Sequence, residues 1–275
     1  MALVRKKMRV GILGCGAIGS RIAKSVCQEL KGHCQLAGFY DCNPVKMMTL
    51  AKTLKKRDLP KRSLKELIKS CDLMVEAVNA SRTDEFVNAA LKARRHVLAM
   101  SVGKLLGNKK LFATAAKNHC HLLIPSGAIA GLDALKAASL VPIDKIVLTT
   151  RKPLNGFTQN EYLTKKKIDL ASIRKETVLF DGNVSAAVRH FPQNINVAAT
   201  LAFASGLPSK IRVRIITSPG YKMNSHEIEI KGDFGRIVTR AENVTCPDNP
   251  KTSYLAVLSA IKTLKDFCSG DRVGT

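Results

Sequence analysis

The chain has 275 residues, of which 45% are hydrophobic and 24% are charged. These are ordinary values for a globular protein with a buried core, and the length suits two domains or one large domain. The formal net charge is +24, from 45 Lys and Arg against 21 Asp and Glu. The basic residues are spread along the chain and aromatic residues make up only 5%, so a nucleic-acid partner is not expected.

A membrane-spanning segment, a secretion signal and a metal site are not expected either. The longest uncharged stretches, such as residues 122–132, are far too short to span a bilayer, and the basic N-terminus is not followed by a signal-peptide cleavage site. None of the eight cysteines forms a C-x-x-C pair or a zinc-binding spacing. We therefore expect a cytoplasmic protein in a reducing compartment, without a bound metal.

The first motif along the chain is a glycine-rich turn between a predicted strand, residues 10–13, and a predicted helix, residues 21–30. Its spacing, G-x-G-x-x-G, is typical of dinucleotide-binding proteins. The first glycine permits a tight turn, the second lets the backbone approach a pyrophosphate, and the third allows close packing of helix on strand. The predicted cofactor-binding residues of this turn are Gly14, Gly16, Ala17, Ile18 and Gly19.

An acidic residue follows the second predicted strand, residues 35–40. This residue, Asp41, lies 22 positions after Gly19, where a carboxylate can accept hydrogen bonds from the adenosine ribose hydroxyls. Asp41 therefore favours NAD as cofactor. Lys46 and the basic excess also admit the 2′-phosphate of NADP.

Strands and helices alternate through the first 125 residues. Further strands are predicted at residues 73–78, 96–100 and 120–124, with helices at 83–93 and 109–118 between them. This alternation predicts an α/β fold with a Rossmann-type, doubly wound parallel sheet. Residues 1–125 are thus expected to form a dinucleotide-binding domain.

The pattern changes in residues 126–252. Strand-like segments follow one another with fewer helices between them, which predicts a second α+β domain with a mainly antiparallel sheet. These segments are residues 146–150, 177–180, 211–217, 226–231 and 236–240. We expect this second domain to carry the substrate, the catalytic residues and the dimer contacts, and the final helix, residues 253–268, to pack back on the first domain.

One histidine is placed to carry acid–base chemistry. His226 lies in a strand-like segment, on the same face as Ile228 and Ile230. A histidine there can exchange a proton near neutral pH, although a purely structural histidine is an equally open interpretation. Asn196 precedes a helix of small residues, where it can either cap the helix or bind a carboxamide.

Three cations lie next to turn residues: Arg151, Lys152 and Lys251. Each is a candidate for holding a substrate carboxylate, and the alternative is a cation exposed to solvent. The residues alone do not separate these two interpretations.

Six stretches together resemble the L-aspartate dehydrogenase family. They are Gly11-Ile-Leu-Gly-Cys-Gly-Ala-Ile-Gly19, Pro125-Ser-Gly-Ala-Ile-Ala-Gly-Leu-Asp-Ala134, Leu148-Thr-Thr-Arg-Lys152, Phe191-Pro-Gln-Asn-Ile-Asn-Val-Ala-Ala-Thr200, Asn224-Ser-His-Glu-Ile228 and Asn249-Pro-Lys-Thr-Ser-Tyr-Leu255. The resemblance implies NAD(P)-dependent oxidative deamination of L-aspartate to iminoaspartate, a role in NAD biosynthesis, and a homodimer. It also implies that His226 is catalytic and that Ala130 and Asn196 contact the nicotinamide side of the cofactor.

Two other functions stay open at this point. One is another two-domain dehydrogenase or reductase that acts on a semialdehyde or a cyclic imine. The other is a cofactor-binding regulator without turnover. Formation of NADH that depends on aspartate distinguishes the first interpretation from both.

Overall fold

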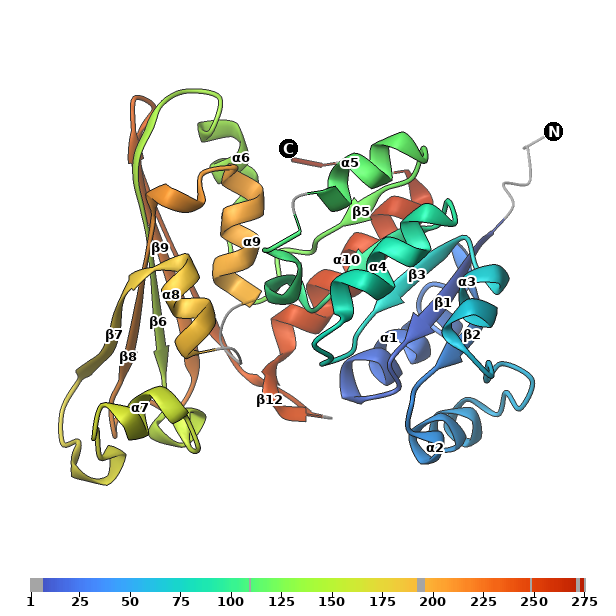
Figure 1. The fold of residues 1–275 in the computed structure, drawn as a ribbon, viewed down its shortest axis with the longest axis horizontal. Helices are drawn as coiled ribbons and strands as arrows, with labels where there is room; N and C mark the ends of the chain where they lie inside the picture. Colours follow the sequence, from blue (N-terminus) through green and yellow to red (C-terminus); the bar gives the residue numbers. More distant parts are fainter. Residues whose placement is uncertain (1–6, 109, 192–195, 248, 271–272, 275) are drawn as a thin grey trace. The chain divides into compact units, whose positions relative to one another are not determined.

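The computed structural model describes residues 7–108, 110–191, 196–247, 249–270 and 273–274. The chain divides into two compact units (Figure 1). The first comprises Met1–Pro125 with Val257–Arg272, and the second comprises Ser126–Ala256 with Val273–Thr275.

The first unit is built on a five-stranded parallel sheet with the strand order β2-β1-β3-β4-β5. From β1, at Met8–Leu13, the chain crosses to β2 on one side and later to β3 on the other. Such a reversal opens a crevice at the carboxyl ends of the strands, where ligands of these folds bind. The predicted doubly wound parallel sheet is confirmed. The remaining strands are β2 (Cys34–Tyr40), β3 (Leu73–Glu76), β4 (His96–Ala99) and β5 (Leu122–Leu123).

Two helices of this unit, α2 and α3, begin at residues whose side chains cap them. The side chain of Asn43 accepts hydrogen bonds from the backbone N–H groups of Val45 and Lys46, and that of Ser63 accepts one from Glu66. Asn and Ser are favoured at this position because their side chains satisfy the free N–H groups of a first helical turn. The helices are α1 (Ala17–Cys27), α2 (Pro44–Leu54), α3 (Leu64–Ser70), α4 (Thr83–Lys92) and α5 (Lys110–Lys117).

The last helix, α10 (Tyr254–Ser269), contributes to the first unit from Val257 onward. Its Phe267 ring lies edge-on to the ring of His96 on β4, with 4.9 Å between the centroids. An aromatic pair in this arrangement adds to the stabilisation from buried area alone.

The second unit holds a five-stranded mixed sheet with the order β10-β9-β6-β8-β7. The pairs β10–β9, β9–β6 and β7–β8 are antiparallel, whereas β6 and β8 run parallel. The parallel pair arises because the chain passes through β7 and two helices and then enters the sheet between β6 and β7, antiparallel to β7. These elements are β6 (Ile143–Lys152), β7 (Thr177–Asn183), α8 (Val184–His190), α9 (Asn196–Ser205), β8 (Ile211–Thr217), β9 (Asn224–Gly232) and β10 (Gly235–Asn243).

Several boundaries in the second unit differ from the prediction. Strand β6 continues to Lys152, two residues beyond the predicted end. The stretch expected to be a turn around Lys251 is a strand, β12 (Asn249–Ser253), which pairs with β11 (Thr245–Cys246). A short helix, α7 (Glu161–Lys165), was not predicted, and α6 spans Leu132–Ala138. Among the described helices, none is long and apolar enough to cross a membrane.

Candidate functional site

The three glycines of the β1–α1 turn differ in what requires them. Gly14 has a φ of +99°, and a Cβ there would lie 2.4 Å from the carbonyl oxygen of Ala77. A Cβ on Gly19 would lie 1.9 Å from the carbonyl oxygen of Gly14. A Cβ on Gly16 would meet no atom within 4 Å. Packing within the protein thus explains Gly14 and Gly19, while Gly16 leaves open space above the backbone, as a bound pyrophosphate requires.

The N-terminus of α1 faces the same turn. Gly16 caps this helix without a side-chain hydrogen bond, and the first turn, which includes Ala17 and Ile18, contains no acidic residue. The free N–H groups and the positive end of the helix dipole therefore remain available to an anion. This donor set fits the phosphates of a dinucleotide.

Asp41 follows β2 and is buried, with 9% of its surface exposed. One carboxylate oxygen, Oδ2, accepts a 2.7 Å hydrogen bond from the N–H of Cys15, and the other, Oδ1, accepts a 2.8 Å bond from the N–H of Asn43. Asp41 therefore joins the glycine-rich turn to the start of α2. A carboxylate has further lone pairs, so ribose hydroxyls can still donate to it.

A cavity of about 240 Å³ lies between α1 and α2, next to this turn. Cys15 and Lys24 line it from one side, and Lys46 and Thr49 from the other. Two ammonium groups at one cavity favour an anionic occupant. The position beside Asp41 is where the 2′ substituent of an adenosine ribose is expected.

Glu76, at the end of β3, has no exposed surface, and the sequence interpretation did not single it out. Its carboxylate oxygens accept hydrogen bonds from the N–H groups of Val78, at 2.8 Å, and Ser101, at 3.0 Å. Burial raises the pKa of this carboxyl group above its ordinary value. Glu76 thus ties the ends of β3 and β4 together at the ligand-binding edge of the sheet. The feature of the sequence that could have identified Glu76 is its position as an acidic residue within the otherwise apolar run of residues 73–78.

In the second unit, His226 lies on β9 with 5% of its surface exposed. Its Nδ1 atom lies 3.0 Å from the hydroxyl oxygen of Thr150 on β6, and the strand register pairs these two residues directly. Burial, and secondarily the charge of Lys152, lower the pKa of His226 to about 3. The imidazole is therefore neutral before a substrate binds, as a proton acceptor must be.

The neighbouring cations Arg151 and Lys152 point to opposite faces of the sheet, because side chains alternate along a strand. Lys152 shares a face with Thr150 and His226, and burial lowers its pKa to about 8 although part of the side chain is exposed. Arg151 lies on the other face, where its Nη1 is 3.2 Å from Oε2 of Glu227. The structure thus places Lys152, and not Arg151, beside the histidine. The side chain of the third candidate, Lys251, lies outside the described residues.

The turn that contains Ala130 is held by β10. The carbonyl oxygen of Ala130 accepts a 3.1 Å hydrogen bond from the hydroxyl of Thr239, and that of Ala128 accepts one from Asn243 Nδ2 at 3.0 Å. Asn196 is the first residue of α9 and is exposed. Both residues thus belong to the second unit, like His226, and Ala130 is fixed by the same sheet.

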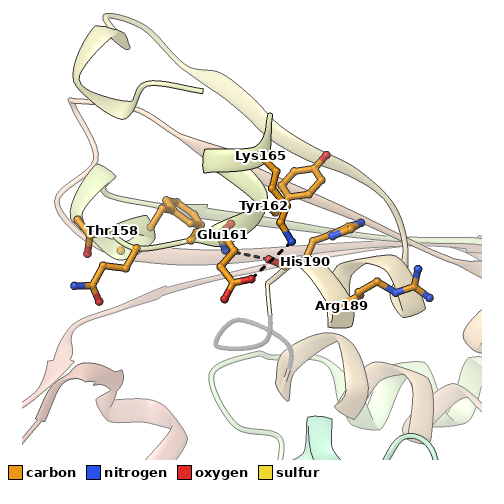
Figure 2. A pocket seen from close by; sticks show the side chains of 10 residues that line it. Thr158, Glu161, Tyr162, Lys165, Arg189 and His190 are labelled. Carbon is orange, nitrogen blue, oxygen red and sulfur yellow. Dashed lines mark hydrogen bonds and ion pairs between the residues drawn. The ribbon is translucent and has the colours of Figure 1, made fainter. Parts of the chain in front are cut away.

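A larger pocket, of about 490 Å³, lies elsewhere in the second unit, around α7 and the end of α8 (Figure 2). Glu161 and Lys165 are paired there at 3.9 Å with both side chains mostly exposed, and the rings of Tyr162 and His190 lie 4.3 Å apart. None of the predicted site residues lines this pocket. Its charged groups are solvent-exposed, so it lacks the buried polar groups that characterise a reaction site.

No cluster of three potential metal ligands occurs among the described residues, which include all six histidines. His96, the first residue of β4, and His121, directly before β5, stack on each other with their ring centroids 5.4 Å apart. All eight cysteines are free thiols.

Comparison with known proteins first defines the class. Residues 14–125 match the NAD-binding domain model of homoserine dehydrogenases, and residues 133–267 match the C-terminal domain model of aspartate dehydrogenases. Together with the glycine-rich turn, these matches identify a two-domain, nicotinamide-dinucleotide-dependent dehydrogenase. A homoserine dehydrogenase structure from Thiobacillus denitrificans shares the fold, with a TM-score of 0.63 and 15% identity over 96% of this chain and 73% of that chain.

The relatives then give the family. L-aspartate dehydrogenases from Methanosarcina barkeri and Methanococcoides burtonii are 40% and 41% identical to this chain, each over 98% of this chain and 100% of its own length. The aspartate dehydrogenase structure from Thermotoga maritima has the same fold, with a TM-score of 0.73 and 23% identity over 97% of this chain and 99% of that chain. The chain belongs to the L-aspartate dehydrogenase family.

Proposed function

We propose that this protein is an NAD(P)-dependent L-aspartate dehydrogenase, which oxidises L-aspartate to iminoaspartate, and that the imine hydrolyses to oxaloacetate and ammonia. The observation that carries the proposal is the match of L-aspartate dehydrogenases to both units, the one with the dinucleotide turn and the one with His226. The test is a spectrophotometric assay with L-aspartate and each nicotinamide cofactor. Absence of NADH or NADPH formation with aspartate, when another substrate is turned over, would overturn it.

The residues of the first unit fit the cofactor. Gly16 leaves the space for the pyrophosphate, the N-terminus of α1 supplies N–H donors, and Asp41 accepts from the ribose hydroxyls. In the second unit, Ala130 and Asn196 are the residues proposed to meet the nicotinamide side. When bound, the nicotinamide ring supplies the hydride acceptor for the oxidation.

His226 is proposed to accept the proton that the substrate must lose. The ammonium group of aspartate has no lone pair, so one proton has to leave before the nitrogen can form a double bond to Cα. A neutral imidazole on β9 takes this proton, and the Cα–H bond then breaks with its electron pair as hydride. The imidazolium afterwards returns its proton to solvent or to the leaving ammonia.

Lys152 is proposed to hold a carboxylate of the substrate. It lies on the same sheet face as His226, and its buried ammonium group lowers the pKa of the imidazole. A bound carboxylate would add an anion beside this ammonium group and raise the pKa of both groups, because a nearby anion favours their charged forms. Substrate binding itself would thereby turn a weak base into one that can accept a proton.

We further propose a role in NAD biosynthesis, a cytoplasmic location and a homodimer, as the family resemblance implies. A homodimer would have twice the 29.9 kDa mass of the chain. Light scattering coupled to size-exclusion chromatography would measure this mass directly.

A further inference from the structure

His226 sits in a row of residues that runs across the sheet and ends at Phe180 on β7. The strand register places Ile215, Thr150, His226 and Ala241 next to one another on β8, β6, β9 and β10. Thr150 and Ile215 have 2% of their surface exposed. The threonine hydroxyl is thus the one polar group that this row offers to the imidazole.

The contact between the two residues is defined on both strands. Thr150 Oγ1 lies 3.0 Å from His226 Nδ1, which is hydrogen-bond distance. Among the described residues, Thr150 provides the only side-chain hydrogen bond to this ring. The two residues are 76 positions apart, and β6 and β9 pair without interruption from Lys145 to Arg151, so the geometry is fixed by the sheet and not by a loop.

We propose that Thr150 is a positioning residue for His226: its hydroxyl oxygen accepts a hydrogen bond from Nδ1–H, so that Nε2 carries the lone pair that takes the substrate proton. This inference rests on the proposed aspartate dehydrogenase activity. A neutral imidazole has one N–H donor and one acceptor nitrogen, so fixing the donor at Nδ1 fixes the acceptor at Nε2.

The cycle of the reaction supports this direction of the bond. When Nε2 takes the proton from the substrate ammonium, the imidazolium has N–H groups at both nitrogens. An accepting hydroxyl keeps its bond to Nδ1–H in both states of the ring. A donating hydroxyl would have to turn round in a buried row each time the ring was protonated, and the N–H would meanwhile lack a partner, which costs about 1–3 kcal/mol.

Two substitutions distinguish a positioning role of the Thr150 hydroxyl from a role of the side chain in packing alone. Thr150→Val keeps the branched shape and removes the hydroxyl, whereas Thr150→Ser keeps the hydroxyl and removes a methyl group. We expect kcat to fall about 10–100-fold in T150V with a smaller change in KM for aspartate, and T150S to recover most of the loss. Equal kcat in the wild type and T150V, or equal losses in T150V and T150S, would overturn the proposal.

Nitrogen-15 NMR of histidine-labelled protein gives a second measurement that needs no turnover. We expect the His226 proton on Nδ1 in the wild type and in T150S, and a shift of population toward Nε2–H in T150V. A wild-type ring protonated at Nε2 would contradict the assignment even if T150V failed to fold. If the wild type shows no turnover with aspartate, the proposed function is overturned. If the wild type is active and T150V is equally active, the proposed function stands and only the role of Thr150 is overturned.

Discussion

The carboxylate of Asp41 accepts a 2.7 Å hydrogen bond from the backbone N–H of Cys15, the residue between the first two glycines of the dinucleotide turn. Through its second bond, to the N–H of Asn43, the same carboxylate fixes the start of α2. The residue proposed to bind the ribose therefore also shapes the loop proposed to bind the pyrophosphate. Affinity for the cofactor and local stability are coupled at this position.

Asp41→Asn should weaken both properties. The amide keeps one acceptor oxygen but turns an NH₂ group toward a backbone N–H, and an unpaired buried N–H costs about 1–3 kcal/mol. We expect a lower melting temperature and weaker binding of NAD in a calorimetric titration. Asp58→Asn, at an exposed position, is the matched control and should leave both unchanged. Full NAD affinity in D41N would argue against a ribose contact.

Substitutions of two glycines in the turn should have different effects, one on NAD binding and the other on stability. Gly16→Ala adds a methyl group where no protein atom lies within 4 Å, so the fold should persist while NAD affinity falls at least about tenfold, because the methyl group occupies the proposed phosphate space. Gly19→Ala should destabilise the protein instead, since its Cβ would lie 1.9 Å from the carbonyl oxygen of Gly14. Thermal unfolding with and without NAD measures both effects. A G16A variant that binds NAD normally would contradict the proposed position of the pyrophosphate.

His226→Gln should remove the proton acceptor. We expect kcat to fall about 10²–10⁴-fold while NADH still binds, which fluorescence titration can show. The matched control is His33→Gln, in the turn before β2. A loss of only a few-fold with an intact fold would point to a structural histidine.

The same substitution should change how stability depends on pH. The pKa of His226 falls from 6.5 to about 3 on folding, so the unfolded chain binds this proton more readily. Between pH 6.5 and about 3 the unfolded state therefore gains a proton that the folded state does not, and stability falls as the pH falls. H226Q should lose less stability than the wild type over this range in urea-unfolding measurements. Parallel curves would show that His226 is not buried in its neutral form.

Lys152→Gln should raise KM for aspartate about 10–100-fold, since a charge-assisted bond to a carboxylate is lost. Arg151→Gln, on the opposite face and paired with Glu227, should change KM little. In the wild type, kcat/KM should decrease above pH about 8, where Lys152 loses its proton in the enzyme without substrate. A larger effect of R151Q than of K152Q would reverse the assignment.

Lys46 should affect NADP more than NAD. It lines the cavity between α1 and α2 together with Lys24, where a 2′-phosphate is expected. Lys46→Ala should weaken binding of adenosine 2′,5′-bisphosphate about tenfold, by loss of a charged contact of about 1.4 kcal/mol, and leave AMP binding nearly unchanged. Lys52→Ala, also on α2 but outside the cavity lining, is the control. Equal effects on both nucleotides would exclude a 2′-phosphate contact at Lys46.

Local patterns in the sequence predicted much of this protein. The glycine spacing and the change from helix–strand alternation to strand repeats are short-range features, and they identified the two kinds of sheet. The mixed character of the second sheet was not predictable in this way. Whether β8 runs parallel to β6 depends on the path of the chain through two helices, and no local residue pattern records that path.

What the sequence by itself determined is which residues are candidates for the chemistry: the turn from Gly14 to Gly19, the acid after β2, and a histidine on a strand-like segment. The tertiary structure alone decided their partners. It placed Thr150 opposite His226, turned Lys152 toward that histidine and Arg151 away from it, and gave Asp41 two backbone donors. These contacts join residues that are 2 to 76 positions apart in the sequence. Strand register and burial bring the distant residues together, and both are fixed only when the sheet packs its hydrophobic face.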